Sequence, residues 1–161
     1  MMRRLLLLSI LLAGCAREAT PPAADGPDAA LLHGGLEYTA DTRVMESFPV
    51  QLATTVTIAN RGSAAVTLTL PDGCAVLLRV FRSATGTVPA YDALHNVVCT
   101  LALQEVTIPP GGREQFSARS DAREILGDSL SDGTYWLRAL VRPNGGEVEV
   151  PAGEVQLAVP R

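Results

Sequence analysis

Apolar and polar residues alternate most regularly in residues 51–74, QLATTVTIANRGSAAVTLTLPDGC. One side of the first run carries Leu52, Thr54, Val56 and Ile58, and the second run repeats the alternation with Val66, Leu68 and Leu70. A period of two residues indicates a β-strand with one buried face. Between the runs, Asn-Arg-Gly-Ser at residues 60–63 supplies the residues of a short hairpin loop. The pattern therefore predicts a β-hairpin at residues 51–74.

Short apolar runs separated by turn residues continue through the rest of the chain. The expected strands are an entering edge strand within residues 36–50 and further strands at residues 74–82, 101–108, 113–119, 134–142 and 147–159. The strand at 113–119 should bury Phe116 and Ala118 by alternation. The strand at 74–82 is apolar on both faces, so it should be covered on both sides, and the strand at 134–142 should be central in its sheet. Residues 121–130 are too short and too polar for more than a helical turn or a connecting loop.

Seven to nine short strands without a periodic helix predict an all-β fold, an antiparallel immunoglobulin-like β-sandwich. The segment DGTY, which ends at Tyr135, resembles the corner of Greek-key sandwiches in which a tyrosine hydroxyl bonds back to nearby backbone. A closed barrel is the alternative architecture. The length left after the leader suits one compact domain, expected at residues 35–161.

The N-terminus has the pattern of a bacterial lipoprotein signal. Residues 1–14 combine the basic pair Arg3 and Arg4 with an apolar run too short to span a bilayer, which is typical of a secretory signal peptide. Residues 12–15, LAGC, match the lipobox, in which the cysteine sulfur is diacylated before cleavage. The sequence therefore predicts lipidation at Cys15. An ordinary signal peptide with an incidental cysteine is the alternative.

Residues 15–34 should form the lipid anchor and a flexible spacer. Residues 16–30 are rich in Ala, Pro, Asp and Gly and have no apolar period. Several acyl chains give stable attachment, because each buried methylene contributes about 0.8 kcal/mol. Ala16 follows the cysteine in place of an aspartate, and resemblance to lipoproteins of double-membraned bacteria then favours the outer membrane. The expected location is the cell envelope, on the periplasmic face of that membrane.

The charge of the chain argues against nucleic acid as a partner. The net charge is −4, and it becomes −6 when Arg3 and Arg4 are removed with the leader. Binding to nucleic acid depends on a basic footprint. The paired glycines at 111–112 and 145–146 lie in turns between strands instead of before a helix, so they do not form a phosphate-cradling loop. The sequence predicts no cofactor.

Two cysteines remain after lipidation, Cys74 and Cys99. The compartment beyond the inner membrane is oxidising, so the sequence predicts a disulfide, and closing a loop of about 25 residues should stabilise the domain by about 3 kcal/mol. The alternative is a metal site formed by these cysteines and His95, which would lack a CxxC or HxxxH spacing and have only three ligands. His33, in the approach to the domain, is expected to be a solvated linker residue.

Several of these segments, taken in order, resemble the BsuPI family, the domain named for an intracellular proteinase inhibitor. The matching pieces are VTIANRGSAAVTLTLPDGC, LALQEVTIPPGG and DGTYWLRALV. They resemble that family's strand, Asn-x-x-Ser, strand and Pro-x-Gly opening, its Leu-x-Pro-Gly-Glu stretch and its Pro-Gly-x-Tyr strand. The resemblance spans roughly residues 52–141. It implies a sandwich fold and binding to a protease or another protein, and it supplies no catalytic residues.

The chain departs from the BsuPI pattern at two aromatic positions. Residues 88–100, VPAYDALHNVVCT, stand in place of a tryptophan-bearing segment, and residues 118–124, ARSDARE, stand in place of Trp-Asp-Gly. A bridge between Cys74 and Cys99 would constrain the same region covalently. A lipid-anchored protein of the envelope cannot meet the cytoplasmic protease that the family name suggests.

Catalysis is not expected from the residue pattern. His95 is the one histidine inside the expected domain, and no G-x-S-x-G elbow accompanies it. Glu147 and Glu149 alternate on the outer side of one strand, which is the pattern of a solvated edge that discourages aggregation. These observations predict a protein that is not an enzyme.

The expected function is a membrane-anchored protein-interaction module of the envelope. Trp136 and Arg138 alternate away from the predicted core, and together with Tyr91 they form the candidate binding face, with the loop at residues 85–96 as a further contact region. For Trp136 the alternative is that a neighbouring loop covers it. The alternative function is a proteinase inhibitor that presents a loop to an extracytoplasmic protease.

Overall fold

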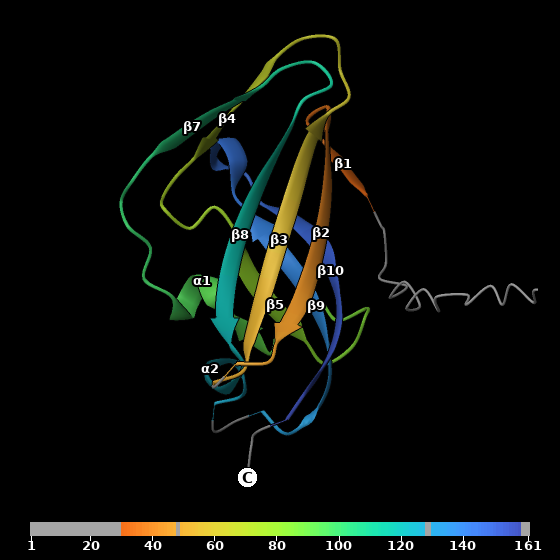
Figure 1. Ribbon diagram of the computed structural model, residues 1–161, viewed down its shortest axis with the longest axis vertical. Helices are drawn as coiled ribbons and strands as arrows, with labels where there is room; N and C mark the ends of the chain where they lie inside the picture. Colours follow the sequence, from red (N-terminus) through yellow and green to blue (C-terminus); the bar gives the residue numbers. More distant parts are fainter. Residues whose placement is uncertain (1–29, 48, 128–129, 159–161) are drawn as a thin grey trace, which may run out of the picture.

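Two four-stranded antiparallel sheets face each other in the computed structural model, which describes residues 30–47, 49–127 and 130–158 (Figure 1). The first sheet has the order β1-β2-β3-β8, with strands at Leu31–His33, Leu36–Met45, Gln51–Asn60 and Arg113–Asp121. The second has the order β10-β9-β5-β6, with strands at Val148–Leu157, Gly133–Val141, Leu77–Phe81 and Tyr91–Asp92. The fold is the predicted all-β antiparallel sandwich.

A third, two-stranded sheet lies at one side of the sandwich. It pairs β4 (Val66–Leu70) with β7 (Gln104–Ile108). The helical pieces are short: α1 at Ala93–Asn96, α2 at Ala122–Leu126 and a 3-10 turn, η1, at Pro143–Gly145. The described residues thus contain ten strands, one more than the upper expectation, and the shortest of them, β1 and β6, have three and two residues.

The core forms where the alternating apolar faces of the two sheets meet. Every second residue of β3 is buried, beginning at Leu52, and β9 and β10 contribute the buried residues Leu137, Ala139 and Val150 from the opposite sheet. Burying one such aliphatic side chain fully contributes about 1.5–3 kcal/mol. The burial of alternate residues explains why the strand periods in the sequence are so clear.

The expected hairpin at residues 51–74 is wrong in its pairing, although both of its strands exist. β3 pairs with β2 and β8, whereas β4 pairs with β7, so the two strands belong to different sheets. The hairpin of this region is β2–β3, and residues 61–65 form an arch that carries the chain from one sheet to the other. Period-two alternation is the same for both arrangements, so it could not distinguish them.

The side chain of Asn60 stabilises the arch by three hydrogen bonds. It is fully buried. Its Nδ2 donates to the carbonyls of Ala64 (2.8 Å) and Ile108 (2.9 Å), and its Oδ1 accepts from the amide of Gly62 (2.9 Å). The bond to Ile108 ties the end of β3 to the end of β7, which draws the chain across the sandwich instead of back along β3.

Several local expectations are confirmed. β9 lies between β10 and β5, so it is central in its sheet, and β5 has buried residues on both faces. The hydroxyl of Tyr135 donates to the carbonyl of Ser131 at 2.6 Å, which is the expected tyrosine corner. The described part of the segment expected as a helical turn or loop, residues 121–127 and 130, carries the five-residue helix α2 after the end of β8.

Three details differ from the expectation. The strand expected at 101–108 begins only at Gln104. Phe116 and Ala118 do face inward from β8, but they are only half-buried because β8 is the last strand of its sheet. β1 pairs Leu31 with Tyr38 of β2, so the sheet begins before residue 35, within the expected spacer. The expected signal peptide at residues 1–14 and Cys15 lie outside the described residues.

Candidate protein-interaction site

A disulfide holds the segment that precedes β7 against the segment that precedes β5. Cys74 and Cys99 are bonded, with their Cα atoms 5.5 Å apart, which confirms the predicted bridge. Next to it, the amide of Gly73 donates to the carbonyl of Thr100 at 2.9 Å. A Cβ at Gly73 would lie 2.1 Å from the Thr100 hydroxyl, so only glycine permits this close approach. Residues 97–103, here called the apolar loop, are therefore fixed near their middle.

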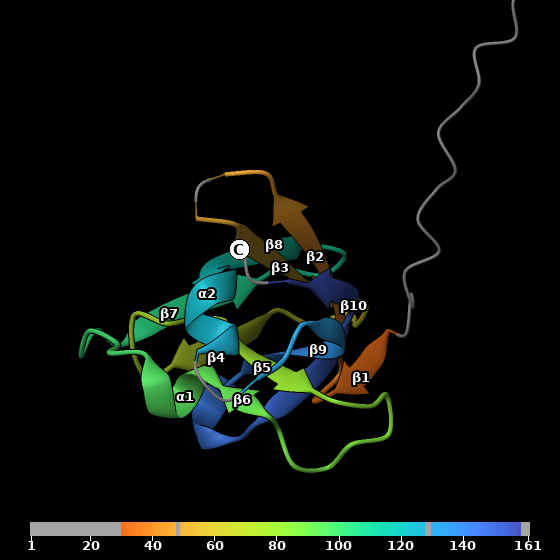
Figure 2. The same ribbon diagram turned by 90° about the horizontal axis from the view of Figure 1, so that it is seen from below.

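The apolar loop exposes aliphatic side chains to solvent. Val98 is 98% exposed, Leu101 100% and Leu103 68%. The amide of Ala102 donates to the carbonyl of Thr100 at 2.8 Å, which closes a tight turn with Leu101 at its centre. The loop projects from the body of the molecule between α1 and β7 (Figure 2). A group of exposed aliphatic side chains on one fixed loop is a candidate surface for binding another molecule.

Asp72 positions the Cys74 end of the bridge. Its Oδ1 accepts from the amide of Cys74 at 2.9 Å, and its Oδ2 accepts from the guanidinium of Arg142. One carboxylate oxygen of Asp72 lies within 4.8 Å of both sulfur atoms. Because the sulfurs are bonded to each other, they are not thiolate ligands. The alternative metal site formed by Cys74, His95 and Cys99 is therefore wrong.

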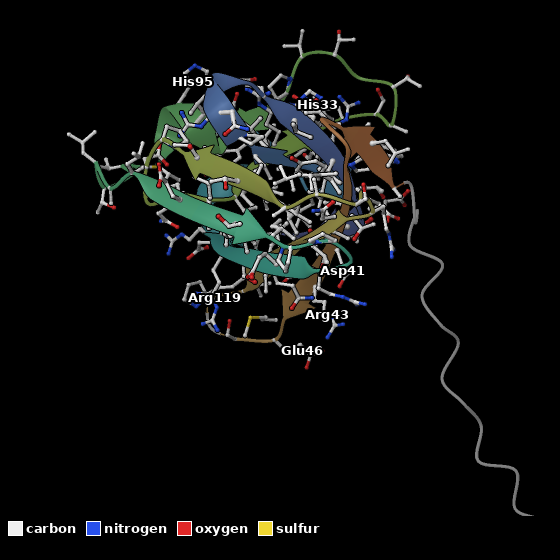
Figure 3. The ribbon with its side chains drawn as sticks, turned by 90° about the horizontal axis from the view of Figure 1, so that it is seen from above. His33, Asp41, Arg43, Glu46, His95 and Arg119 are labelled. Atoms are coloured by element: carbon white, nitrogen blue, oxygen red, sulfur yellow. A yellow bond between two sulfur atoms is a disulfide. The ribbon has the colours of Figure 1, made fainter. Side chains whose placement is uncertain are left out.

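His95 is placed on the surface, away from the bridge. Its side chain is 77% exposed, and its Nδ1 lies 3.5 Å from a carboxylate oxygen of Asp92. Figure 3 shows His95 pointing outward on the opposite side of the molecule from Arg119 of β8. His33 is exposed as expected, but it belongs to β1 instead of a linker and its ring meets that of Tyr38 edge-on at 6.5 Å.

A groove of about 410 Å³ runs along β8, here called the β8 groove. Residues 115–120 of β8 form one wall. The floor and the other wall come from residues 73–78, from Ala93 and Val97 at α1, and from Gln104 at the start of β7. Val97, at the start of the apolar loop, and Gln104, directly after its end, both line the groove, so the two ends of the loop border it.

Backbone groups of β8 face the β8 groove. At the two ends of the β3–β8 ladder, Asn60 donates to the carbonyl of Gly112 and Ala122 donates to the carbonyl of Val50, both at 2.9 Å. Hydrogen-bonded and non-hydrogen-bonded pairs alternate along an antiparallel ladder. Even-numbered residues of β8 therefore bond to β3, and the N–H and C=O groups of residues 115, 117 and 119 point to the free edge.

The side chains predicted as the binding face do not form one exposed surface. Tyr91 is buried, with 8% exposure, so including it in that face was wrong. Trp136 is half-buried on β9. Arg138 stacks on Phe81, with its guanidinium carbon 4.0 Å from the ring centre. Alternation placed Trp136 and Arg138 correctly on one side of β9, but it could not show what covers that side.

Arg138 serves to hold the loop between β5 and β6. Its Nη2 donates to the carbonyls of Ala84 (3.1 Å) and Gly86 (2.8 Å), and its Nη1 donates to Glu149 (3.2 Å). These three bonds engage both terminal nitrogens of its guanidinium within the protein. The loop at residues 85–96 is thus partly fixed, and in it Val88 is 80% exposed.

Glu147 and Glu149 belong to an ion-pair network, which corrects the expectation of a merely solvated edge. Arg79 donates to Asp92 (3.0 Å), to Glu149 (2.5 Å) and to Glu147 (3.2 Å), and its side chain is only 13% exposed. Burial by itself would lower the pKa of Arg79, but the hydrogen bond with Glu149 and the charge of Asp92 outweigh it and raise the pKa above its usual value. The network stabilises the second sheet and positions the start of α1.

The aliphatic residues of the apolar loop were missed as site residues, because alternation assigned residues 101–103 to a strand. One signal was present in the sequence: the run VVCTLAL around Cys99 is apolar without a regular period. An unpatterned apolar run beside a disulfide cysteine is a candidate exposed loop. Within the part of the chain that the structure describes, no helix has the length and apolar character needed to cross a membrane.

Comparisons with known proteins find similarity to solved structures at TM-scores below 0.5. No protein-family profile matches the sequence, and no curated protein matches it. The structure is similar to a structural-genomics target, SoR45, with a TM-score of 0.42 and 16% identity over 81% of this chain and 91% of that chain.

The structure is also similar to part of two β-glucosidases. For the enzyme from Listeria innocua the TM-score is 0.38 with 12% identity over 77% of this chain, and for β-glucosidase 3B from Thermotoga neapolitana it is 0.38 with 16% identity over 77%. The chain spans only 16% and 17% of the length of these enzymes. These similarities carry no statement about activity.

Proposed function

We propose that this protein is a non-enzymatic lipoprotein of the cell envelope, anchored through Cys15, whose sandwich domain binds another protein through the apolar loop. The observation that supports this function is the full exposure of Val98 and Leu101 on a loop that a disulfide fixes. A preformed loop loses little conformational entropy on binding, and each aliphatic side chain that a partner buries contributes about 1.5–3 kcal/mol. The proposal assigns no chemistry to the histidines.

A protein partner fits the loop better than a lipid surface. Residues 93–108 contain no arginine or lysine, whereas attachment to anionic lipid headgroups depends on basic residues beside the apolar ones. The described chain begins at β1, on the side of the molecule opposite the apolar loop in Figures 1 and 2. In this arrangement the loop points away from the side on which the chain leads to the proposed anchor.

The anchor is tested by fractionation of cells that produce the full chain. The wild-type protein should sediment with membranes and incorporate labelled palmitate, and the Cys15→Ser variant should lose the label. Incorporation of palmitate by Cys15→Ser would contradict the assignment of the lipidation site.

The binding surface is tested by photo-crosslinking in intact envelopes. A benzoylphenylalanine side chain placed at Leu101 should yield a discrete adduct with a second protein. The same group at Val88, which is also aliphatic and exposed but lies on the loop between β5 and β6, is the matched control and should yield none. Equal adducts from both positions, or none from either, would refute the apolar loop as the binding surface.

A proteinase inhibitor is the second candidate, and the position of Leu101 favours it. Leu101 is fully exposed at the centre of a tight turn, two residues after the bridged Cys99. A hydrophobic S1 pocket of a serine protease accepts such a side chain, whereas an S1 pocket with an aspartate at its base accepts arginine. The wild-type protein should then inhibit proteases of the first kind, and Leu101→Arg should transfer inhibition to the second. Inhibition unchanged by Leu101→Arg would exclude this loop.

A further inference from the structure

We propose that the β8 groove receives an extended, uncharged segment of the partner protein, which pairs with β8 as an added strand. This inference rests on the proposed function, because it describes the second part of the same binding surface. Addition of a strand to an exposed sheet edge provides affinity through main-chain hydrogen bonds and specificity through alternate side chains.

The backbone of β8 directs hydrogen-bonding groups to its free edge, where such a strand would pair. Residues 115, 117 and 119 direct their N–H and C=O groups to the edge that carries no strand, and β8 pairs only with β3 among the described strands. On the outer face, the side chains of β8 are already held by β3: Gln115 donates to Thr57 at 3.1 Å, and the Ser117 and Thr55 hydroxyls lie 3.1 Å apart. The free edge is therefore a fixed template, and an incoming strand does not have to order it.

The lining of the groove specifies the chemistry of the segment. Among the lining residues only Arg119 is charged, and its side chain lies on the outer, solvent-facing side of β8. The inward-facing positions Phe116 and Ala118 are half-buried and leave apolar surface beside Val97. A charged side chain entering this space would lose its hydration without an opposite charge to pair with. The inward side chains of the added strand are therefore small or aliphatic.

The shape of the region favours a single strand over a second copy of this chain. In both views the β4–β7 pair lies on the side of β8 that faces away from β3 (Figures 1 and 2). Gln104, at the start of β7, lines the groove opposite β8. Edge-to-edge pairing of two copies would place a whole second sheet where this pair lies. A separate extended segment needs room for one strand only.

The test uses Ser117, whose N–H points to the free edge. Ser117→Pro removes that donor without removing a bond of the β3–β8 ladder, and proline is tolerated on an edge where the N–H faces outward. Ser117→Ala is the matched control, because it removes the same hydroxyl and keeps the N–H. In the full chain with benzoylphenylalanine at Leu101, Ser117→Pro should reduce the adduct in envelopes about tenfold relative to Ser117→Ala.

The outcomes separate this inference from the proposed function. An undiminished adduct in Ser117→Pro overturns strand addition and leaves the apolar loop as the binding surface. An adduct of twice the mass of the chain overturns the inference in favour of a second copy. Absence of any adduct in the parent overturns both. If Ser117→Pro does not form the Cys74–Cys99 bridge, Gln115→Pro with Gln115→Ala repeats the test, because the Gln115 N–H also points to the free edge.

Discussion

Replacing Asn60 by alanine should cost the domain about 3 kcal/mol of unfolding free energy. The side chain makes three hydrogen bonds while fully buried, to Ala64, Ile108 and Gly62. Each such bond contributes about 1 kcal/mol net, and more where a buried partner is left unsatisfied. For a domain of this size, a loss of about 3 kcal/mol lowers the melting temperature by about 10 °C.

An aspartate at the same position distinguishes hydrogen bonding from shape. Asn60→Asp keeps the volume but, at neutral pH, sets a buried carboxylate against the carbonyls of Ala64 and Ile108. Burial and these oxygens would raise the pKa of the new carboxyl above its unfolded value of about 3.9. A group with a raised pKa in the folded state contributes its full stability below the unfolded pKa and loses it as the pH rises through the folded pKa. Asn60→Asp should therefore be less stable than Asn60→Ala at pH 7 and recover as the pH falls toward 4.

Urea unfolding measures both effects, with the single tryptophan, Trp136, as a fluorescent reporter. Curves for the wild type, Asn60→Ala and Asn60→Asp at pH 7 and at pH 4.5 give the free energies by linear extrapolation. An Asn60→Ala protein within about 1 kcal/mol of the wild type would refute the role given to Asn60. So would an Asn60→Asp protein whose stability relative to the wild type does not depend on pH.

Three further outcomes concern the Tyr91 hydroxyl, the disulfide and the Arg79–Glu149 ion pair. The Tyr91 hydroxyl is buried without a hydrogen-bond partner in the described part of the chain, and burial, with smaller contributions from Glu124 and Asp92, raises its pKa above 10.0. Stability should therefore fall as the pH rises above about 10, and Tyr91→Phe should be more stable by about 1 kcal/mol and lose less in base, as alkaline urea titrations would show. The double variant Cys74→Ser, Cys99→Ser should lose about 3 kcal/mol and become sensitive to proteolysis within residues 97–103, which mass spectrometry of the fragments detects. Glu149→Gln should cost about 1–2 kcal/mol, and a double-mutant cycle with Arg79→Gln should show that most of this cost depends on the pair.

Much of the fold could be predicted from the sequence, because strand periodicity is local. Burial of alternate residues in β3 and β9 left its pattern within each segment, and the tyrosine corner at Tyr135 involves residues only four positions apart. Pairing is not local. Asn60 and Ile108 are 48 residues apart, and their bond decides that β3 and β4 form an arch. No pattern within residues 51–74 contains that information.

The disulfide could be predicted, but its consequence for the site could not. The number of cysteines and the expected compartment were enough to pair Cys74 with Cys99. Sequence patterns assume that apolar residues are buried, so Leu101 and Leu103 were assigned to a strand. They are exposed because the bridge and the Gly73–Thr100 bond fix the backbone outside the sheet. Covalent and long-range constraints of this kind override local preference.

The prediction that Tyr91, Trp136 and Arg138 form one exposed binding face was wrong for a related reason. Alternation tells which side of a strand a residue faces, but it does not tell what lies over that side. Arg138 lies on the expected side, but its Nη2 donates to the carbonyls of Ala84 and Gly86 in the loop between β5 and β6. Tyr91 is at the end of the same loop and packs inward. A two-residue strand such as β6 is too short for any period to reveal its orientation.

The arch and the β8 groove have a common cause. The turn between β7 and β8 is held at the end of β3 by three bonds to Asn60: its amide donates to Gly112, its carbonyl accepts from Gly111, and its side chain donates to Ile108. From this point β8 runs along β3, whereas β7 runs along β4. The two strands joined by the turn therefore diverge instead of pairing, and the free edge of β8 is left beside a groove. Asn60→Ala should therefore weaken the adduct formed from Leu101 as well as the fold, and it should do so under conditions in which the domain remains folded.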